Sequence, residues 1–130
     1  MEVVTLDLNL QGETVTRVSF DAAITILTDG DYELRVETEA VVRTPAGEVL
    51  RFDPERSGAA TVHLRQLVND VITSAEVGDA GDLLMGFESG AELSVAADSD
   101  YEAWGLVGSN GRRATCMPGG EIALWGEQPR

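Results

Sequence analysis

The sequence predicts an α+β domain in which one amphipathic helix packs on a mostly antiparallel β-sheet. Three observations support this fold class. Apolar and polar residues alternate along most of the first half of the chain, as they do in strands with one buried face. One central segment has helical spacing instead, and turn-forming residues separate the short apolar runs of the second half. The strands would form meanders and hairpins, arranged either as two packed layers or as a sheet curled around the helix.

The chain has 130 residues, enough for one hydrophobic core, and no linker or low-complexity segment divides it. We therefore expect a single α+β domain over residues 1–130. The opening "MEVVTLDLNL" lacks the basic region and the continuous apolar run of a signal peptide. No stretch approaches the roughly 18 apolar residues of a membrane-spanning helix. These features favour a cytoplasmic protein.

The strands of the first half follow from the alternation. It is clearest in "YELRVETEAVVR" at residues 32–43, which predicts one long strand with a bend or bulge partway along. The segments "TDGD" and "TPAGE" predict turns on either side of this strand. Further strands of the same meander are predicted at residues 4–10, 14–20, 23–28 and 49–52.

A helix is predicted after Pro54. The apolar residues of "SGAATVHLRQLVNDV" recur mostly at three- and four-residue intervals, which places them on one face of a helix. Ser57 is a suitable N-cap for it. The apolar residues of this face are Ala60, Leu64, Leu67, Val68 and Val71.

Short strands are predicted throughout the second half. "ITSAEV" predicts a strand, "GDAGD" a turn and "LLMGFESGAELSV" a hairpin about Ser89 and Gly90. "WGLV", "RATC" and "EIALW" predict final strands separated by "GSNG" and "MPGG". Trp125, at the end of the last strand, is expected to pack in the core.

The formal net charge is −14, and all nine basic residues are arginines. A net charge of roughly 2 to 8 already keeps a small domain soluble, so solubility alone does not require this excess. An acidic surface repels phosphate backbones and anionic lipid headgroups, and it accelerates encounters with a cationic protein. We therefore expect a basic protein partner and neither nucleic-acid nor membrane binding. Codon bias in a GC-rich genome and adaptation to a salt-rich cytoplasm would also produce such a charge, and both stay open.

The stretch "DSDYEAWGL" at residues 98–106 carries three alternating carboxylates, as the start of a calcium-binding loop does. Such a loop also needs glycine at its sixth position and a bidentate glutamate at its twelfth. Counted from Asp98, these positions hold Ala103 and Ser109. The sequence therefore predicts no metal site here, and no cofactor is expected.

The same stretch contains a capping box, S-x-x-E, formed by Ser99 and Glu102, which predicts a single helical turn. Tyr101 and Trp104 are three residues apart, so on such a turn they face the same way. They would either close the core at one end or anchor a binding surface with an acidic rim. The candidate partner-binding residues are Asp98, Asp100, Tyr101, Glu102 and Trp104.

No catalytic residue is predicted. His63 is the sole histidine, no nucleophile motif accompanies it, and it is interpreted as a partly buried structural residue. Cys116 follows an arginine pair that would lower its thiol pKa. A cysteine in such a position is more often a small buried residue on a short strand, and Cys116 is interpreted as one. Arg112 and Arg113, in the "SNGRR" turn, are expected to be solvated.

Two spaced motifs mark the C-terminal part of the chain, Y-x-x-W and P-G-G-E-x-x-x-W. With the upstream "FESGAELSV", they resemble a family of small, functionally uncharacterised actinobacterial proteins. The resemblance covers roughly residues 80–126 and implies no activity. In a general way the chain is also similar to the small acidic immunity proteins that accompany bacterial toxins. The motif positions are Tyr101 and Trp104, then Pro118, Gly119, Gly120, Glu121 and Trp125.

These observations favour a non-enzymatic, acidic protein-binding domain, monomeric or homodimeric, that acts as an immunity- or antitoxin-like inhibitor of a cationic partner. One alternative is a small-ligand-binding domain with a pocket between helix and sheet. Another is a carboxylate-based or metal-dependent hydrolase. A flat acidic patch around exposed aromatic residues would favour the inhibitor, a deep apolar pocket the ligand-binding domain, and converging acids in a cleft the enzyme.

Overall fold

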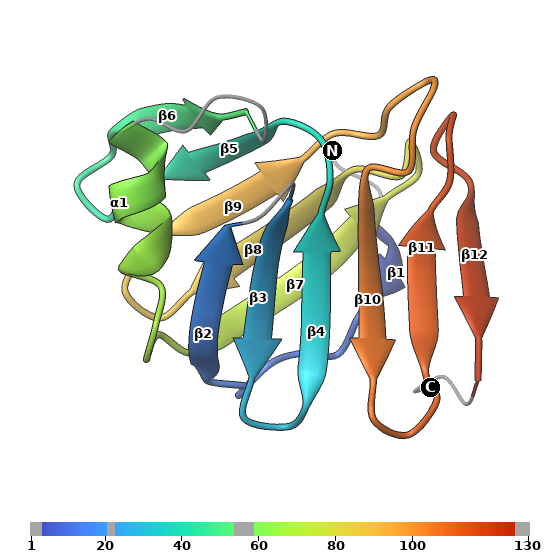
Figure 1. Cartoon of the computed structure of the whole chain (residues 1–130), viewed down its shortest axis with the longest axis horizontal. Helices are drawn as coiled ribbons and strands as arrows, with labels where there is room; N and C mark the ends of the chain where they lie inside the picture. The colour runs from blue at the N-terminus through green and yellow to red at the C-terminus, as the bar shows by residue number, and fades with distance from the viewer. Residues whose placement is uncertain (1–3, 21–22, 54–58, 127–130) are drawn as a thin grey trace.

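A computed structural model describes residues 4–20, 23–53 and 59–126. In this part of the chain the strands form two six-stranded antiparallel sheets that face each other (Figure 1). The front sheet contains, in spatial order, β12 (Ile122–Trp125), β11 (Arg113–Cys116), β10 (Trp104–Gly108), β4 (Tyr32–Val36), β3 (Ile24–Thr28) and β2 (Val15–Phe20). The rear sheet contains β1 (Val4–Asp7), β7 (Ile72–Gly78), β8 (Leu83–Phe87), β9 (Glu92–Val95), β5 (Ala40–Arg43) and β6 (Val49–Phe52). The predicted antiparallel sheet is therefore confirmed, as two packed layers and not as one curled sheet.

The core lies between the two sheets and is made by the inward-facing residues of each strand. Leu34 and Val36 of the front sheet and Leu93 and Val95 of the rear sheet are at most 2% exposed. Their neighbours in sequence point outward and are more exposed, which is the period-two pattern of half-buried strands. Burial of this apolar surface is the main force that holds the layers together.

The helix α1 (Ala59–Arg65) packs against β2, β5 and β6 and covers one open side of the sandwich (Figure 1). It is shorter than the segment predicted from residues 60–71. Leu64 is buried, whereas Val62 is 59% exposed. Ser57, the predicted N-cap, lies outside the described residues. No helix in the described ranges is long and apolar enough to cross a membrane.

The helix ends early because the following residues bond to strand β2. The main chain of Val15 accepts a hydrogen bond from the N–H of Asn69, at 2.7 Å, and donates one to the carbonyl of Asp70, at 2.9 Å. Asn69 has a φ of 75°, a left-handed conformation that a helix cannot continue through. Leu67 stays buried in this turn, so its helical spacing reflects contact with the core and not a continuous helix.

Two predicted strands need correction. The long strand expected over residues 32–43 is two strands in different sheets, since β4 ends at Val36 and β5 starts at Ala40 in the opposite layer. Both of these residues are fully buried, so the alternation continues in phase through the crossover. The strand expected over residues 4–10 ends at Asp7, and Asn9 has a φ of 57°.

The two halves of the chain follow the same path in opposite sheets. Strands β2–β4 form a meander in the front sheet, after which the chain crosses to the rear hairpin β5–β6. Strands β7–β9 form a meander in the rear sheet, after which the chain crosses to β10–β12 in front. As a result β4 pairs with β10, and β9 pairs with β5. The two crossovers, residues 37–39 and 96–103, meet at one end of the sandwich, where the N–H of Glu37 donates to the carbonyl of Ala103 at 2.9 Å.

Candidate functional site

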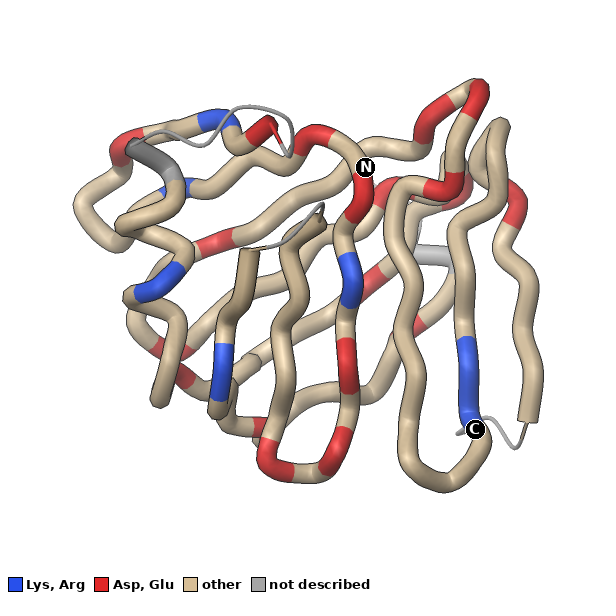
Figure 2. Tube along the Cα trace, in the orientation of Figure 1, with Lys and Arg blue, Asp and Glu red and all other residues tan. Residues whose placement is uncertain are grey.

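The two crossovers border an open hollow of about 730 Å³, which we call the acidic hollow. Carboxylates predominate on its surface, and Figure 2 shows acidic residues gathered along the same end of the molecule. It combines a short crossover from the first half of the chain with a longer one from the second half, so neither half alone would make it. The acidic hollow is lined by Glu37, Thr38, Glu39, Asp53, Asp100, Tyr101, Glu102 and Pro118.

Asp98 shapes the longer crossover. Its Oδ1 accepts hydrogen bonds from the N–H of Asp100, at 2.8 Å, and of Tyr101, at 3.1 Å, and its carbonyl accepts one from the N–H of Gly119, at 2.8 Å. The predicted helical turn with a Ser99 cap is wrong, because these residues form bends and Asp98 itself satisfies the exposed N–H groups. Asp98 therefore positions the hollow's residues without lining it.

Tyr101 and Trp104 do not face the same way. Tyr101 is 69% exposed and projects into the acidic hollow, whereas Trp104 is 1% exposed and begins β10 in the core. Residues an odd number apart point to opposite faces when the backbone is extended, which explains the difference. The indole Nε1 of Trp104 donates to the carbonyl of Gly81 at 3.0 Å. Of the predicted partner-binding residues, Asp100, Tyr101 and Glu102 line the hollow together, whereas Trp104 is buried in the core and does not line it.

The carboxylates of the hollow differ in their partners. Glu37 lies 3.4 Å from Arg35, and Glu39 lies 2.7 Å from Arg51. Both pairs are well exposed, and such pairs stabilise a fold by only about 0–1 kcal/mol. The side chains of Asp100 and Glu102 make no ion pair or hydrogen bond with any described residue. The hollow thus has carboxylates available for a cation.

A buried hydroxyl also lies at the hollow. Thr38 Oγ1 has no hydrogen-bond partner among the described residues and is screened from water. An unsatisfied buried hydroxyl costs roughly 1–3 kcal/mol of stability. The described residues contain no cluster of three or more ligands arranged to hold a metal ion.

Cys116 is confirmed as a small buried residue on a short strand. It is fully buried in β11, and its Sγ lies 3.4 Å from the carbonyl of Gly81. Burial raises the pKa of the Cys116 thiol above its ordinary value of 9.0, the N–H of Ala103 lowers it, and the carboxylate of Asp82 raises it further. A protonated, inaccessible thiol is a poor nucleophile.

The arginine pair is split between core and surface, which corrects the expectation that both are solvated. Arg112 is 1% exposed, its Nη2 donates to the carbonyl of Leu8, and its guanidinium lies 5.7 Å from the ring centre of Tyr32. Arg113 is exposed and lies 5.2 Å from the ring centre of Trp125. The burial of Arg112 could have been predicted from its position two residues before Ala114. In an extended strand these two residues face the same side, and Ala114 is fully buried.

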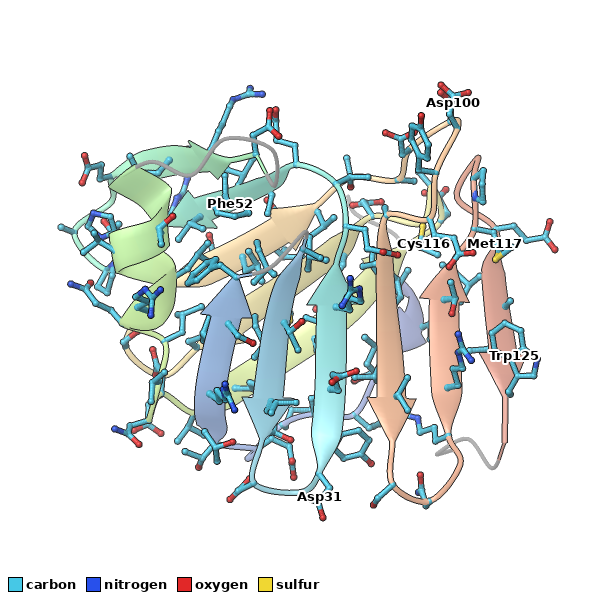
Figure 3. The ribbon with its side chains drawn as sticks, viewed as in Figure 1. Asp31, Phe52, Asp100, Cys116, Met117 and Trp125 are labelled. Carbon is cyan, nitrogen blue, oxygen red and sulfur yellow. The ribbon has the colours of Figure 1, made fainter. Side chains whose placement is uncertain are left out.

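Trp125 is 48% exposed, so the prediction that it packs in the core is wrong (Figure 3). It pairs with Arg113 across the β11–β12 ladder and therefore shares the outer face of the front sheet.

The "PGG" segment also has a structural role. Gly120 has a φ of 96°, and its α-carbon lies so close to the carbonyl of Ala80 that a Cβ would overlap it.

A second, smaller pocket of about 200 Å³ lies where the helix meets the rear sheet. His63, Asp70 and Ser89 line it, but they do not form a catalytic triad. The Ser89 hydroxyl donates to Asp70 and accepts from the N–H of Ala91, while His63 Nε2 lies 3.9 Å from Glu48. His63 is 28% exposed, consistent with a partly buried structural residue.

Comparison with known proteins gives a family but no described function. No curated protein and no solved structure matches the chain. A family match covers nearly the whole chain, including both crossovers and the "PGG" turn. A family model described as a family of unknown function, DUF6188, matches residues 6–126, and the chain therefore belongs to this family.

Proposed function

We propose that this protein is a non-enzymatic binding domain that recognises a cationic protein through the acidic hollow, as an immunity- or antitoxin-like inhibitor. The observation that carries the proposal is the convergence of carboxylates and an exposed tyrosine from both halves of the chain on one open surface. The long-range attraction of the −14 chain would bring a basic protein to this surface.

The hollow's side chains suit lysine and arginine. Asp100 and Glu102 would pair with the cation, and the Tyr101 ring offers a face for a cation–π contact, about 0.5–1 kcal/mol at an exposed site. Such a contact combines an electrostatic encounter with an aromatic anchor, the arrangement expected of a protein interface.

The hollow is better suited to binding than to hydrolysis. Acid–base hydrolysis by two carboxylates needs one of them kept protonated by an apolar environment. Glu37, Glu39, Asp100 and Glu102 all have exposed side chains, and two of them are paired with arginines. The second candidate function, small-ligand binding, would use the pocket beside His63. Its volume of about 200 Å³ is below the roughly 300 Å³ at which ligand pockets begin.

The test compares two sets of charge-neutralising substitutions with equal effect on net charge. The hollow variant is Glu37→Gln, Glu39→Gln, Asp100→Asn and Glu102→Gln. The control variant neutralises exposed acids elsewhere: Asp31→Asn, Glu33→Gln, Asp79→Asn and Glu88→Gln. The probe is a short polyarginine peptide, measured by calorimetry at low and at physiological salt.

We expect the hollow variant to bind the peptide at least about tenfold more weakly than the control variant, a difference of about 1.4 kcal/mol. Equal losses in both variants would mean that the peptide senses only the net charge, and the proposed site would be wrong. In the genome, a toxin-like reading frame directly upstream would support the inhibitory role.

A further inference from the structure

In the described part of the chain, strand β12 is a sheet edge. It is the last strand of the front sheet, and no described strand pairs with its outer side. Helix α1 covers the opposite side of the sandwich, where β2 and β6 end the two sheets, and lies far from β12 (Figure 1). An open edge presents unpaired N–H and C=O groups to any strand that approaches it.

The other three edges in the described part of the chain have features that hinder pairing. The ladders of β1 and β2 each contain a register shift of the bulge type, and both strands carry charged residues. Strand β6 has Arg51 and lies under the helix. Strand β12 has the sequence "IALW", without charge or proline, and pairs regularly with β11. Natural edge strands rarely lack all of these protections.

The apolar side chains of β12 are exposed on both of its faces. Leu124 pairs with Ala114, which is fully buried, yet Leu124 itself is 45% exposed because the rear sheet does not cover it. Trp125, on the opposite face, is 48% exposed. A strand that added to this edge would remove both side chains from water.

We propose that β12 pairs with β12 of a second copy of this chain, antiparallel and about a two-fold axis at Ala123. The register follows from the hydrogen bonds. The N–H of Met117 donates to the carbonyl of Glu121 at 2.8 Å, so the main-chain groups of Glu121 point toward β11. Because this direction alternates along a strand, the N–H and C=O groups of Ile122 and Leu124 point away from β11. With the axis at Ala123, Ile122 of each copy faces Leu124 of the other, and both residues exchange main-chain hydrogen bonds.

Charge favours a second copy in this register. Glu121 lies on the same face as Trp125 and would come to rest beside the partner's Trp125, which already lies on Arg113. An acidic side chain would thus meet an arginine across the interface. The antiparallel arrangement also turns the second copy end for end, so that the two acidic hollows lie at opposite ends of the joined sheet. Repulsion between two −14 chains is reduced by this separation.

The experiment is sedimentation of the full chain over a range of concentrations. Leu124→Lys places a charge on the pairing edge, and Val49→Lys is the matched control at a 56% exposed position on β6. We expect the wild type and Val49→Lys to reach twice the mass of one chain below about 1 mM, and Leu124→Lys to weaken dimerisation at least about tenfold. Circular dichroism and melting curves show whether each variant folds.

A second variant, Glu121→Arg, decides the question if Leu124→Lys does not fold. Glu121 is exposed, and its replacement would set an arginine against the partner's Arg113, so dimerisation should weaken here too. A wild type that stays monomeric throughout, or a dimer that none of these edge substitutions weakens, would overturn the proposal. Binding of polyarginine by the hollow is a separate measurement, so the failure of either proposal leaves the other intact.

Discussion

Substitution of Trp104 and of Tyr101 should have opposite consequences, although the two aromatic residues are three positions apart. Trp104 is 1% exposed in the core and Tyr101 is 69% exposed at the acidic hollow. The structure therefore predicts that Trp104→Ala destabilises the fold, whereas Tyr101→Ala weakens the binding of a cationic partner and leaves the fold stable.

The magnitude follows from burial. Truncation of a fully buried tryptophan to alanine typically costs about 3–5 kcal/mol, because apolar contacts are lost and a cavity remains. Trp104→Ala also removes the indole N–H that donates to Gly81, whose carbonyl then keeps the weaker contact with the Cys116 thiol. In a domain of this size about 1 kcal/mol lowers the melting temperature by roughly 3–5 °C, so a fall of about 10–20 °C is expected.

Tyr101→Ala should change stability by less than about 0.5 kcal/mol, since the side chain is exposed and only its backbone N–H bonds to Asp98. Differential scanning calorimetry measures both melting temperatures, and calorimetric titration with polyarginine measures binding by the folded protein. A Tyr101→Ala variant that melts as low as Trp104→Ala would refute this assignment, as would a Trp104→Ala variant that melts within about 2 °C of the wild type.

Three further predictions concern the core and its turns. Arg112→Met should cost about 1–3 kcal/mol in urea denaturation because the carbonyl of Leu8 loses its donor, while the exposed Arg113→Met should cost under about 0.5 kcal/mol; equal costs would contradict the burial of Arg112. Gly120→Ala should destabilise by about 2–4 kcal/mol, measured in the same way, since alanine adds both an unfavourable φ and an overlap with backbone. Cys116 should resist a thiol reagent such as Ellman's until the protein unfolds, because the side chain is fully buried. Its raised pKa means that the unfolded thiol loses its proton first as pH increases, so the stabilisation from Cys116 is complete below pH 9 and is lost above it. A Cys116→Ala variant should lack this alkaline loss, and the same loss in both proteins would assign it to other groups.

The sequence predicted most strands because alternation and turn residues act locally. The hairpins about "TDGD", "TPAGE" and "SNG" all form where expected. Alternation reports that a side chain faces the core, but both sheets share that core. It therefore could not show that β4 and β5 lie in different layers, with the crossover between Val36 and Ala40. The predicted helix was too long for a related reason. Leu67 is buried and has helical spacing from Leu64, but it lies in the turn that follows the helix.

The candidate site was only partly predictable. The carboxylates of residues 98–102 were evident, but their partners at residues 37–39 and Asp53 are distant in sequence and meet them only because the two crossovers lie together. The exposure of Trp125 was also hidden from sequence. Its strand has the composition of a buried one, and it stays exposed because it is the last strand of its sheet.

Nuclear magnetic resonance can show directly whether the acidic hollow is the surface that binds a cationic partner. Isotope-labelled protein would be titrated with polyarginine at physiological salt, and the backbone amide shifts followed residue by residue. We expect the largest changes at residues 37–39 and 100–102. Changes of similar size at Glu33, Asp79 and Glu88, which lie outside the hollow, would show attraction to net charge alone and would contradict binding at the hollow.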